Sequence, residues 1–190
     1  ERPILRLIMD FRATNSVTRI LAGDVRTLSG SPALQHVVLP QGRVLRLSAD
    51  DLVSAFYLFA LPAEWSRLMC FSGKVSWRSL GYEREGQVHV GATVLPMGWA
   101  SAVGVLQHAH RRLALRSPLA GGAGLLGSCE IRRDSLFPDL EVEGQLWSLY
   151  LDDTNLLEIL EKKVAAELEG KAPEEQERLR RAYHHWGIPV

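Results

Sequence analysis

Apolar and polar residues alternate over residues 44–49, and this run ends at Asp50 and Asp51. An alternation with a period of two is typical of a strand that buries one face. A second apolar segment, residues 145–151, leads directly into Asp152 and Asp153 and also reads as a strand. Shorter apolar runs bounded by turn residues predict further strands over residues 5–9, 68–71 and 88–95. Two of the predicted strands therefore end in adjacent aspartates.

Helical periodicity occupies the segments between these strands. Residues 52–59 contain no helix breaker and predict a short helix, and Ser101 is the predicted N-cap of a helix that continues to Leu115. Apolar residues spaced three or four apart predict a helix over residues 156–169, and Pro173 and Gly187 delimit a last helix. Strands interleaved with a few helices indicate the α+β fold class.

The composition fits a compact protein with a substantial core. Of the 190 residues, 46% are hydrophobic and 23% are charged, which excludes a disordered, collagen-like or disulfide-stapled chain. The most apolar stretch, residues 90–106, is interrupted by Pro96, Gly98 and Gly104 and is shorter than a membrane span. With no signal sequence either, we expect an intracellular protein of the cytoplasm or nucleus that is not secreted and has no membrane partner. The abrupt start and end of the chain suggest a piece of a longer one.

Charge is unevenly distributed, although the formal net charge is zero. Residues 1–133 carry 16 Lys and Arg against 9 Asp and Glu, and residues 134–190 carry 6 against 13. All but one of the basic residues in the first part are arginines, whose planar guanidinium suits bidentate contacts with phosphates. This pattern is compatible with an ordinary solvated surface or with a phosphate-rich partner.

Asp51, Asp152 and Asp153 are the residues that bear most directly on chemistry. Two carboxylates about 4 Å apart repel by about 4 kcal/mol at an effective dielectric constant near 20, so a cluster of them needs a cation or a bound proton. Carboxylate oxygens suit Mg²⁺, and a pair of such ions can clamp the attacking and leaving oxygens of a phosphoryl transfer. Adjacent aspartates are, however, also common as polar residues of hairpin turns.

Four ordered sequence blocks give these aspartates a context. They are LRLIMDFRATN at residues 5–15, DLVSAFY at residues 51–57 with Leu61 and Pro62 after it, LPMGW at residues 95–99 with Ser101 and Gln107 in step, and YLDD at residues 150–153. A single short motif recurs by chance, whereas four in order are specific. The set resembles the fingers strand, the two palm motifs and the Tyr-X-Asp-Asp box of the reverse transcriptases of retroviruses and LTR-type retrotransposons.

The resemblance implies a catalytic and metal-binding set made of Asp51, Asp152 and Asp153, with two Mg²⁺ or Mn²⁺ ions as cofactors. Asp50 is an alternative ligand to Asp51, although Leu52 and the register of the block favour Asp51. The implied substrate-binding residues are Arg6 for the incoming triphosphate, Phe56 under the deoxyribose, Met97 and Gly98 beside the nascent base pair, Gln107 facing the same region, and Tyr150 near the primer end.

The family's fold implies a ferredoxin-like antiparallel palm sheet with helices on one face, together with part of the fingers. Residues 1–49 would supply partial fingers and the first palm strand, residues 50–155 the palm with its catalytic motifs, and residues 156–190 a helical segment leading toward a thumb. The implied activity is RNA-directed DNA polymerisation, in which a primer 3′-hydroxyl on an RNA or DNA template attacks a dNTP. A fragment that lacks the thumb is expected to hold primer–template poorly.

A binding module is the alternative to an enzyme. A degenerate or domesticated palm of this kind would bind nucleic acid or a protein without polymerising. The intact aspartates and Phe56 favour the enzyme. The sequence leaves the oligomeric state open.

Overall fold

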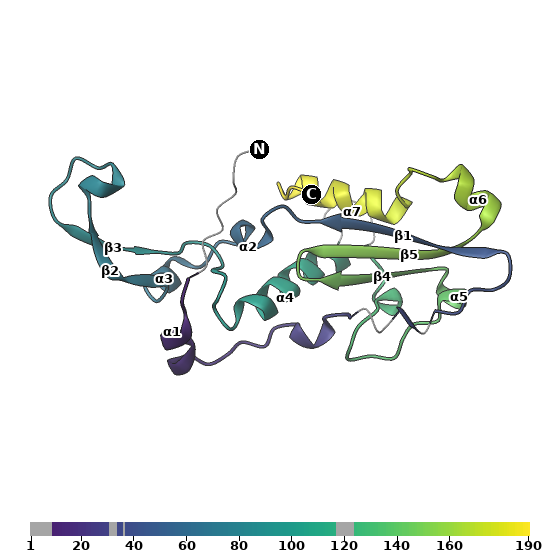
Figure 1. Cartoon of the computed structure of the whole chain (residues 1–190), viewed down its shortest axis with the longest axis horizontal. Coiled ribbons are helices and arrows are strands. Elements are labelled where there is room, and N and C mark those ends of the chain that lie inside the picture. Colours follow the sequence, from purple (N-terminus) through teal and green to yellow (C-terminus); the bar gives the residue numbers. More distant parts are fainter. Residues whose placement is uncertain (1–8, 31–33, 36, 117–123) are drawn as a thin grey trace. The chain divides into compact units, whose positions relative to one another are not determined.

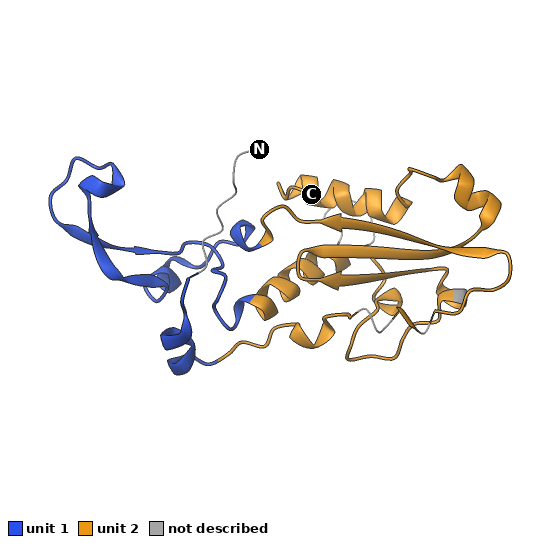
Figure 2. Cartoon of the chain, viewed as in Figure 1, with its two compact units in different colours: residues 1–19, 56–102 blue, residues 20–55, 103–190 orange. Residues whose placement is uncertain are grey.

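Two compact units make up the chain, of which the computed structural model describes residues 9–30, 34–35, 37–116 and 124–190. Unit 1 comprises residues 1–19 and 56–102, and unit 2 comprises residues 20–55 and 103–190 (Figure 2). Each unit thus combines two segments that lie far apart in the sequence. The predicted α+β class is confirmed, because both units combine helices with a small antiparallel sheet.

Unit 2 is organised around a three-stranded antiparallel sheet in the order β1–β5–β4 (Figure 1). Its strands are β1 (Arg43–Asp51), β4 (Gln145–Tyr150) and β5 (Asp153–Glu161). Strands β1 and β4 correspond to the strands that the apolar patterns of residues 44–49 and 145–151 predict. Leu151 and Asp152 form the two-residue turn that joins β4 to the central strand β5.

The central strand corrects the predicted helix over residues 156–169. Residues 156–161 belong to β5, and the helix that follows covers only Lys162–Glu167. Leu156 and Leu157 are adjacent and each is 1% exposed, so both faces of β5 are covered at this point. A strand covered on both faces loses its alternation, and the spacing of its leucines then imitates a helix. The predicted helix over residues 156–169 is therefore wrong for residues 156–161, which are strand.

The helices of unit 2 are mostly short. The described ones are η1 (Val25–Thr27), α4 (Ala102–Leu115, whose first residue belongs to unit 1), η4 (Gly127–Cys129), α5 (Leu140–Glu143), α6 (Lys162–Glu167) and α7 (Glu174–His185). Helices α4 and α7 occur where the sequence predicts them. Within the described part of the chain, no helix is long and apolar enough to span a membrane.

Helices α4 and α7 pack on the same face of the sheet. Asp50 of β1 and Thr154 of β5 are cross-strand partners and point to that face. Arg180 of α7 forms an ion pair with Asp50. His110 of α4 and Tyr183 of α7 both reach the hydroxyl of Thr154. The opposite face is therefore the one that carries Asp51.

Unit 1 contains a β-hairpin and several helical turns. Its described elements are α1 (Arg12–Val17), α2 (Ala55–Leu58, which begins at the last residue of unit 2), α3 (Ala63–Ser66), β2 (Cys70–Ser76), η3 (Arg78–Leu80) and β3 (Gln87–Gly91). The predicted short helix shrinks to α2, and the predicted strands over residues 68–71 and 88–95 overlap β2 and β3 only in part. Most of the strand predicted over residues 5–9 lies outside the described residues.

A close backbone contact fixes the start of α4 within unit 2. Gly104 is buried in α4, and a Cβ atom at this position would lie 2.1 Å from the carbonyl oxygen of Ala22. The amide of Asp24 donates a hydrogen bond of 3.2 Å to the carbonyl of Gly104. The segment around Ala22 can approach the helix this closely because residue 104 has no side chain.

We expect Gly104→Ala to destabilise the protein. Alanine favours a helix over glycine by about 1 kcal/mol, whereas forcing an extra carbon into a filled space costs about 1–3 kcal/mol, and here the obstacle is backbone. The net effect should be a melting temperature lower by about 2–8 °C. The matched control is Gly73→Ala, where a Cβ meets nothing within 4 Å. Equal melting of the two variants would contradict the close contact.

Candidate functional site

Two of the three predicted catalytic aspartates are direct cross-strand neighbours. Asp51, the last residue of β1, is opposite Asp153, the first residue of β5, and Tyr150 of β4 is opposite Asp153 on its other side. The Cβ atoms of directly opposed residues in such a ladder are about 4.5–5.5 Å apart. Asp152 precedes Asp153 in the turn. The structure thus brings the predicted catalytic set together with Tyr150 at the β4–β5 turn.

Electrostatics in this cluster favour a positive partner. Partial burial raises the pKa of the Asp153 carboxyl above its ordinary value, and the charges of Asp152 and Asp51 raise it further. The side chains of Asp51 and Asp153 are nevertheless open to solvent, and that of Asp152 is half-buried. A carboxylate whose pKa is raised by neighbouring negative charges is stabilised by a nearby cation. The donor atoms are hard oxygens, which fit Mg²⁺ or Mn²⁺.

The carboxylates of Asp51, Asp152 and Asp153 do not surround a common metal position in this structure. Among the residues that the structure describes, no group of three or more His, Cys, Asp or Glu side chains is arranged to hold a metal ion. The chemistry of the donors therefore fits a divalent ion, whereas the side-chain positions would have to close around it.

Asp50 lies on the other face and is engaged in a different contact. Adjacent residues of a strand point to opposite faces, so Asp50 faces α7 while Asp51 does not. The guanidinium of Arg180 donates hydrogen bonds to the carboxylate of Asp50, from Nη2 to Oδ1 at 2.6 Å and from Nε to Oδ2 at 3.0 Å. The Asp50 side chain is only 9% exposed. Of the two adjacent aspartates, Asp51 is thus the one with an open carboxylate.

The turn that carries Asp152 is strained. Leu151 has a φ of 56°, in the left-handed region that costs a residue with a side chain about 1–2 kcal/mol. The amide of Leu151 donates to Gln107 Oε1 at 2.9 Å, and its carbonyl accepts from His110 Nδ1 at 2.6 Å. The amide of Leu52 donates to the carbonyl of Asp152 at 3.1 Å, which ties the turn to the end of β1. These contacts hold the turn in its unfavourable conformation.

Gln107 is fully buried and its amide group serves the hairpin. Besides the bond to Leu151, its Nε2 donates to the carbonyl of Leu149 at 3.3 Å and to the hydroxyl of Thr27 at 3.2 Å. In this structure Gln107 supports the backbone of the Leu151–Asp152 turn. Its predicted contact near the nucleotide stays a prediction.

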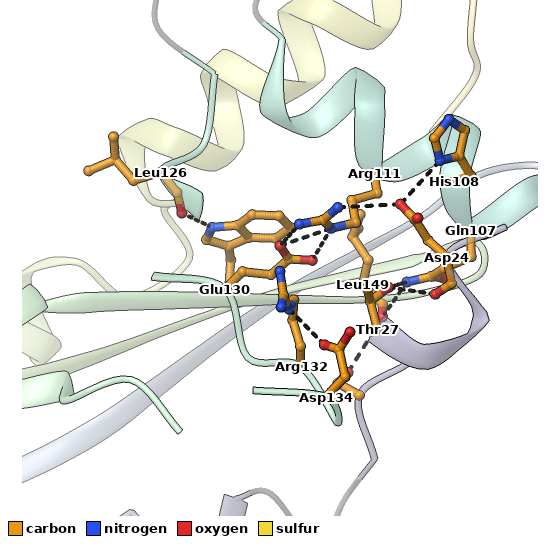
Figure 3. A network of polar contacts seen from close by, with 12 residues as sticks. Asp24, Thr27, Gln107, His108, Arg111, Leu126, Glu130, Arg132, Asp134 and Leu149 are labelled. Carbon is orange, nitrogen blue, oxygen red and sulfur yellow. Dashed lines mark hydrogen bonds and ion pairs between the residues drawn. The ribbon is translucent and has the colours of Figure 1, made fainter. Parts of the chain in front are cut away.

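The next turn of α4 is anchored by ion pairs (Figure 3). Arg111 makes two hydrogen bonds of 2.7 Å to the carboxylate of Glu130, whose side chain is 1% exposed. Arg111 also reaches Asp24, to which His108 is bound at 3.3 Å. The hydrogen bonds to Glu130 raise the pKa of Arg111, so its charge is secure. A buried carboxylate needs such a partner, and the pair fixes α4 against the segment that contains Glu130.

The remaining predicted substrate residues belong to unit 1. Gly98 has a φ of 101°, and a Cβ atom there would lie 2.4 Å from the carbonyl oxygen of Met9. The side chain of Asn15 bridges the same loop, donating to the Gly98 carbonyl at 3.0 Å and accepting from the Ala100 amide at 2.9 Å. The first and third sequence blocks therefore contact each other. The close approach expected at Gly98 is made by this chain's own backbone.

Met97 and Phe56 are half-buried, Met97 in the loop before Gly98 and Phe56 on α2. Arg6 lies outside the described residues. The nucleotide contacts expected of these three residues stay predictions, as does the position of Tyr150 near the primer end.

Sequence reasoning missed the polar residues behind the turn. His110, Tyr183 and Thr154 are fully buried and hydrogen-bonded to one another beneath the Leu151–Asp152 turn. A usable signal was present, since Gln107 and His110 are polar residues three apart on the apolar side of a predicted helix. Two polar side chains on a buried stripe indicate hydrogen-bond partners in the core.

The chain matches no protein-family model and no curated protein. Its chemistry must therefore be inferred from its own residues. The features available are the open carboxylates of Asp51 and Asp153, the turn aspartate Asp152, and the buried supports of that turn.

The raised pKa of Asp153 predicts that Asp153→Asn stabilises the metal-free protein at neutral pH. A raised pKa means that the folded state holds the proton more tightly than the unfolded state, so the favourable contribution present at low pH is lost as the pH rises through the folded pKa. At pH 7 the ionised carboxylate is repelled by its neighbours. Because the group is exposed, we expect a melting temperature higher by only about 1–3 °C.

The measurement is thermal melting at pH 7 and at pH 3 without divalent ions. The gain should vanish at pH 3, where both states of the wild type hold the proton. Glu83→Gln removes one negative charge in unit 1 and serves as the control. A variant that melts below the wild type at pH 7 would show that the cluster is not repulsive.

Proposed function

We propose that this chain is the fingers and palm part of an RNA-directed DNA polymerase of a retroelement. The observation that carries the proposal is the pairing of Asp51 with Asp153 beside Asp152 at the YLDD turn. These residues come from two blocks that resemble the family, about 100 positions apart in the sequence. The β1–β5–β4 sheet with α4 and α7 on one face is compatible with the palm that the resemblance implies.

In this proposal Asp51 and Asp152 bind two divalent ions and Asp153 assists them. The bound ions would neutralise phosphate charge and activate the primer 3′-hydroxyl for attack on the α-phosphate of the dNTP, from which pyrophosphate leaves. The protein's own task is to place the carboxylates, and the ladder and the turn contacts do this. Such catalysis consists mainly of positioning and charge stabilisation.

The blocks also associate in pairs, which supports reading them as one set. The second and fourth blocks meet in unit 2 through Asp51 and Asp153, and the first and third meet in unit 1 through Asn15 and Gly98. Unrelated turn motifs would have no reason to pair in this way. The polar-turn reading of the aspartates explains the YLDD turn but leaves these pairings unexplained.

The arginine excess supports a nucleic-acid partner less strongly than its number suggests. Among the described residues of 1–133, six arginines form ion pairs with carboxylates of the chain, namely Arg12 with Asp10, Arg43 with Glu161, Arg46 with Glu158, Arg78 with Glu85, Arg111 with Glu130 and Arg132 with Asp134. Arginines committed to carboxylates contribute less to phosphate binding. The aspartate cluster, and not the net charge, is therefore the basis of the proposal.

We expect Asp51→Asn and Asp152→Asn each to lower primer extension at least about 100-fold, because each removes a charge that the phosphates require. Asp50→Asn should change extension by less than about fivefold while lowering the melting temperature, since Asp50 pairs with Arg180. The assay is extension of a DNA primer on an RNA template with Mg²⁺ or Mn²⁺. Asp50→Asn is the matched control, one position away on the opposite face.

Two results would overturn this proposal. A wild-type chain that binds primer–template but never extends it with either ion would favour the non-catalytic binding module. Inactivity of Asp50→Asn together with activity of Asp51→Asn would place the metal site on the other face of β1.

Phe56 tests the choice of sugar. The resemblance places its ring under the deoxyribose, where a 2′-hydroxyl would collide with it. Phe56→Val should therefore lower the ratio of kcat/KM for dCTP over CTP by at least about tenfold, because a small change in pocket volume is worth about 10- to 200-fold in selectivity. Use of dCTP itself should stay largely intact.

Phe59→Val is the matched control, since Phe59 is also half-buried and lies three residues further on. It should leave the dCTP/CTP ratio unchanged. If the ratio does not fall in a Phe56→Val protein that melts like the wild type, Phe56 is a core residue and not the gate.

A further inference from the structure

We propose that His110 and Tyr183 are positioning residues that hold the Leu151–Asp152 turn so that Asp152 and Asp153 present their carboxylates beside Asp51. This inference rests on the proposed function, because it assigns these two residues a part in the same site. Neither residue would touch substrate or metal. They act through the backbone of the turn.

The chemistry of each partner determines which atom donates and which accepts in these hydrogen bonds. The carbonyl of Leu151 can only accept, so the Nδ1 of His110 that lies 2.6 Å from it must carry the hydrogen. The other ring nitrogen, Nε2, is then an acceptor and receives a hydrogen bond from the hydroxyl of Tyr183. The hydroxyl of Thr154 lies 3.1 Å from the Tyr183 oxygen and can donate to it. This assignment satisfies each group in turn.

Burial keeps this chain of groups uncharged. His110, Tyr183 and Thr154 are fully enclosed in unit 2. Burial lowers the pKa of His110 and raises the pKa of Tyr183, so each remains in its neutral form near pH 7. The assignment of donors and acceptors given above requires that His110 and Tyr183 are both neutral. The same burial makes each bond expensive to lose, because a freed polar group would find no water.

The contacts enclose the two aspartates on both sides along the chain. Leu151 immediately precedes Asp152, and Thr154 immediately follows Asp153. Both of these flanking residues are bound by the His110–Tyr183 pair. Movement of the turn would therefore have to break a bond on one side or the other.

Helix α7 also reaches the strand end that carries Asp51. Arg180 binds Asp50, and beyond the helix the carbonyl of Pro189 accepts a hydrogen bond of 3.0 Å from the amide of Val53. One helix and the segment after it thus contact the backbone or side chains on both sides of the cluster. This arrangement makes α7 part of the site's support, although it carries none of the predicted catalytic residues.

Two substitutions of His110 separate its contacts. The amide nitrogen of asparagine can occupy the place of Nδ1, so His110→Asn keeps the bond to Leu151 and loses the one to Tyr183. The longer His110→Gln reaches toward Tyr183 and loses the bond to Leu151. Tyr183→Phe removes the hydroxyl and leaves Nε2 of His110 with only the 3.4 Å contact to the hydroxyl of Thr154. The proposal predicts the largest effect for His110→Gln.

We expect His110→Gln to lower kcat for primer extension by about 10- to 100-fold, as misplacement of reacting groups by about 1 Å does. The KM for dNTP should stay within about twofold. Hydrogen exchange of residues 149–154, measured without substrate, should accelerate at least about tenfold. The Mn²⁺ concentration that half-saturates the chain should rise. His110→Asn should show smaller changes in all of these quantities.

The control is Leu179→Val, a buried position on the same helix α7 that lowers stability without touching these hydrogen bonds. If His110→Gln and Tyr183→Phe match Leu179→Val in kcat per folded molecule and in exchange, the two residues are ordinary core and the inference falls. An inactive wild type would overturn the proposed function instead. Faster exchange of the turn and weaker Mn²⁺ binding in His110→Gln would even then support the positioning role.

Discussion

The antiparallel register of β1 against β5 decides which side chains of unit 2 share a face. It sets Asp51 opposite Asp153 on one face and Asp50 opposite Thr154 on the other. A slip of one residue would exchange these roles, because every side chain of a strand changes face when its register shifts by one. Arg180 opposes such a slip, since it holds Asp50 in a largely buried ion pair. The candidate site thus depends on a pairing that is fixed from the opposite side of the sheet.

The sequence predicted those elements whose formation depends mainly on neighbouring residues, such as β1 and α7. The edge strand β1 alternates visibly, and α7 has Pro173 before it and Gly187 after it, so both appear in the sequence. The central strand β5 does not, because its burial is created by partners more than 100 residues away on one side and by the hairpin on the other. The spacing of its leucines does not indicate which strands lie beside it. Contacts between residues that are distant in the sequence are seen only in the structure.

The residues of the candidate site also fall into those that the sequence predicts and those that it does not. The aspartates belong to four sequence blocks that occur in order, and this order made them candidates. The buried residues that hydrogen-bond to their turn belong to no such pattern. His108 and His110 are two residues apart on α4 and point to different sides of the helix, so that His108 binds Asp24 while His110 is buried. Nothing in this spacing indicates the partner of His110, which is Tyr183, 73 residues further along the chain.

Backbone strain and hydrogen bonding oppose each other at the Leu151–Asp152 turn. Leu151 in the left-handed region costs about 1–2 kcal/mol. Each hydrogen bond to its backbone returns about 0.5–1.5 kcal/mol, and the repulsion among the aspartates remains to be offset. Strain and support are therefore of similar size. Removing one support changes the balance, which is why buried residues far from any substrate can matter to the carboxylates.

The geometry of α4 explains how these supports act together. His110 and Arg111 follow Gln107 by three and four residues, so both are its neighbours on the surface of the helix. Gln107 and His110 hold the amide and the carbonyl of the same residue, Leu151, and Arg111 holds Glu130. Glu130 in turn forms a parallel bridge with Trp147 in the middle of β4. Helix α4 is thus fastened both to the turn after β4 and to the segment that pairs with the middle of this strand. The backbone that carries the aspartates is therefore held by α4 as well as by its pairing with β1 through β5.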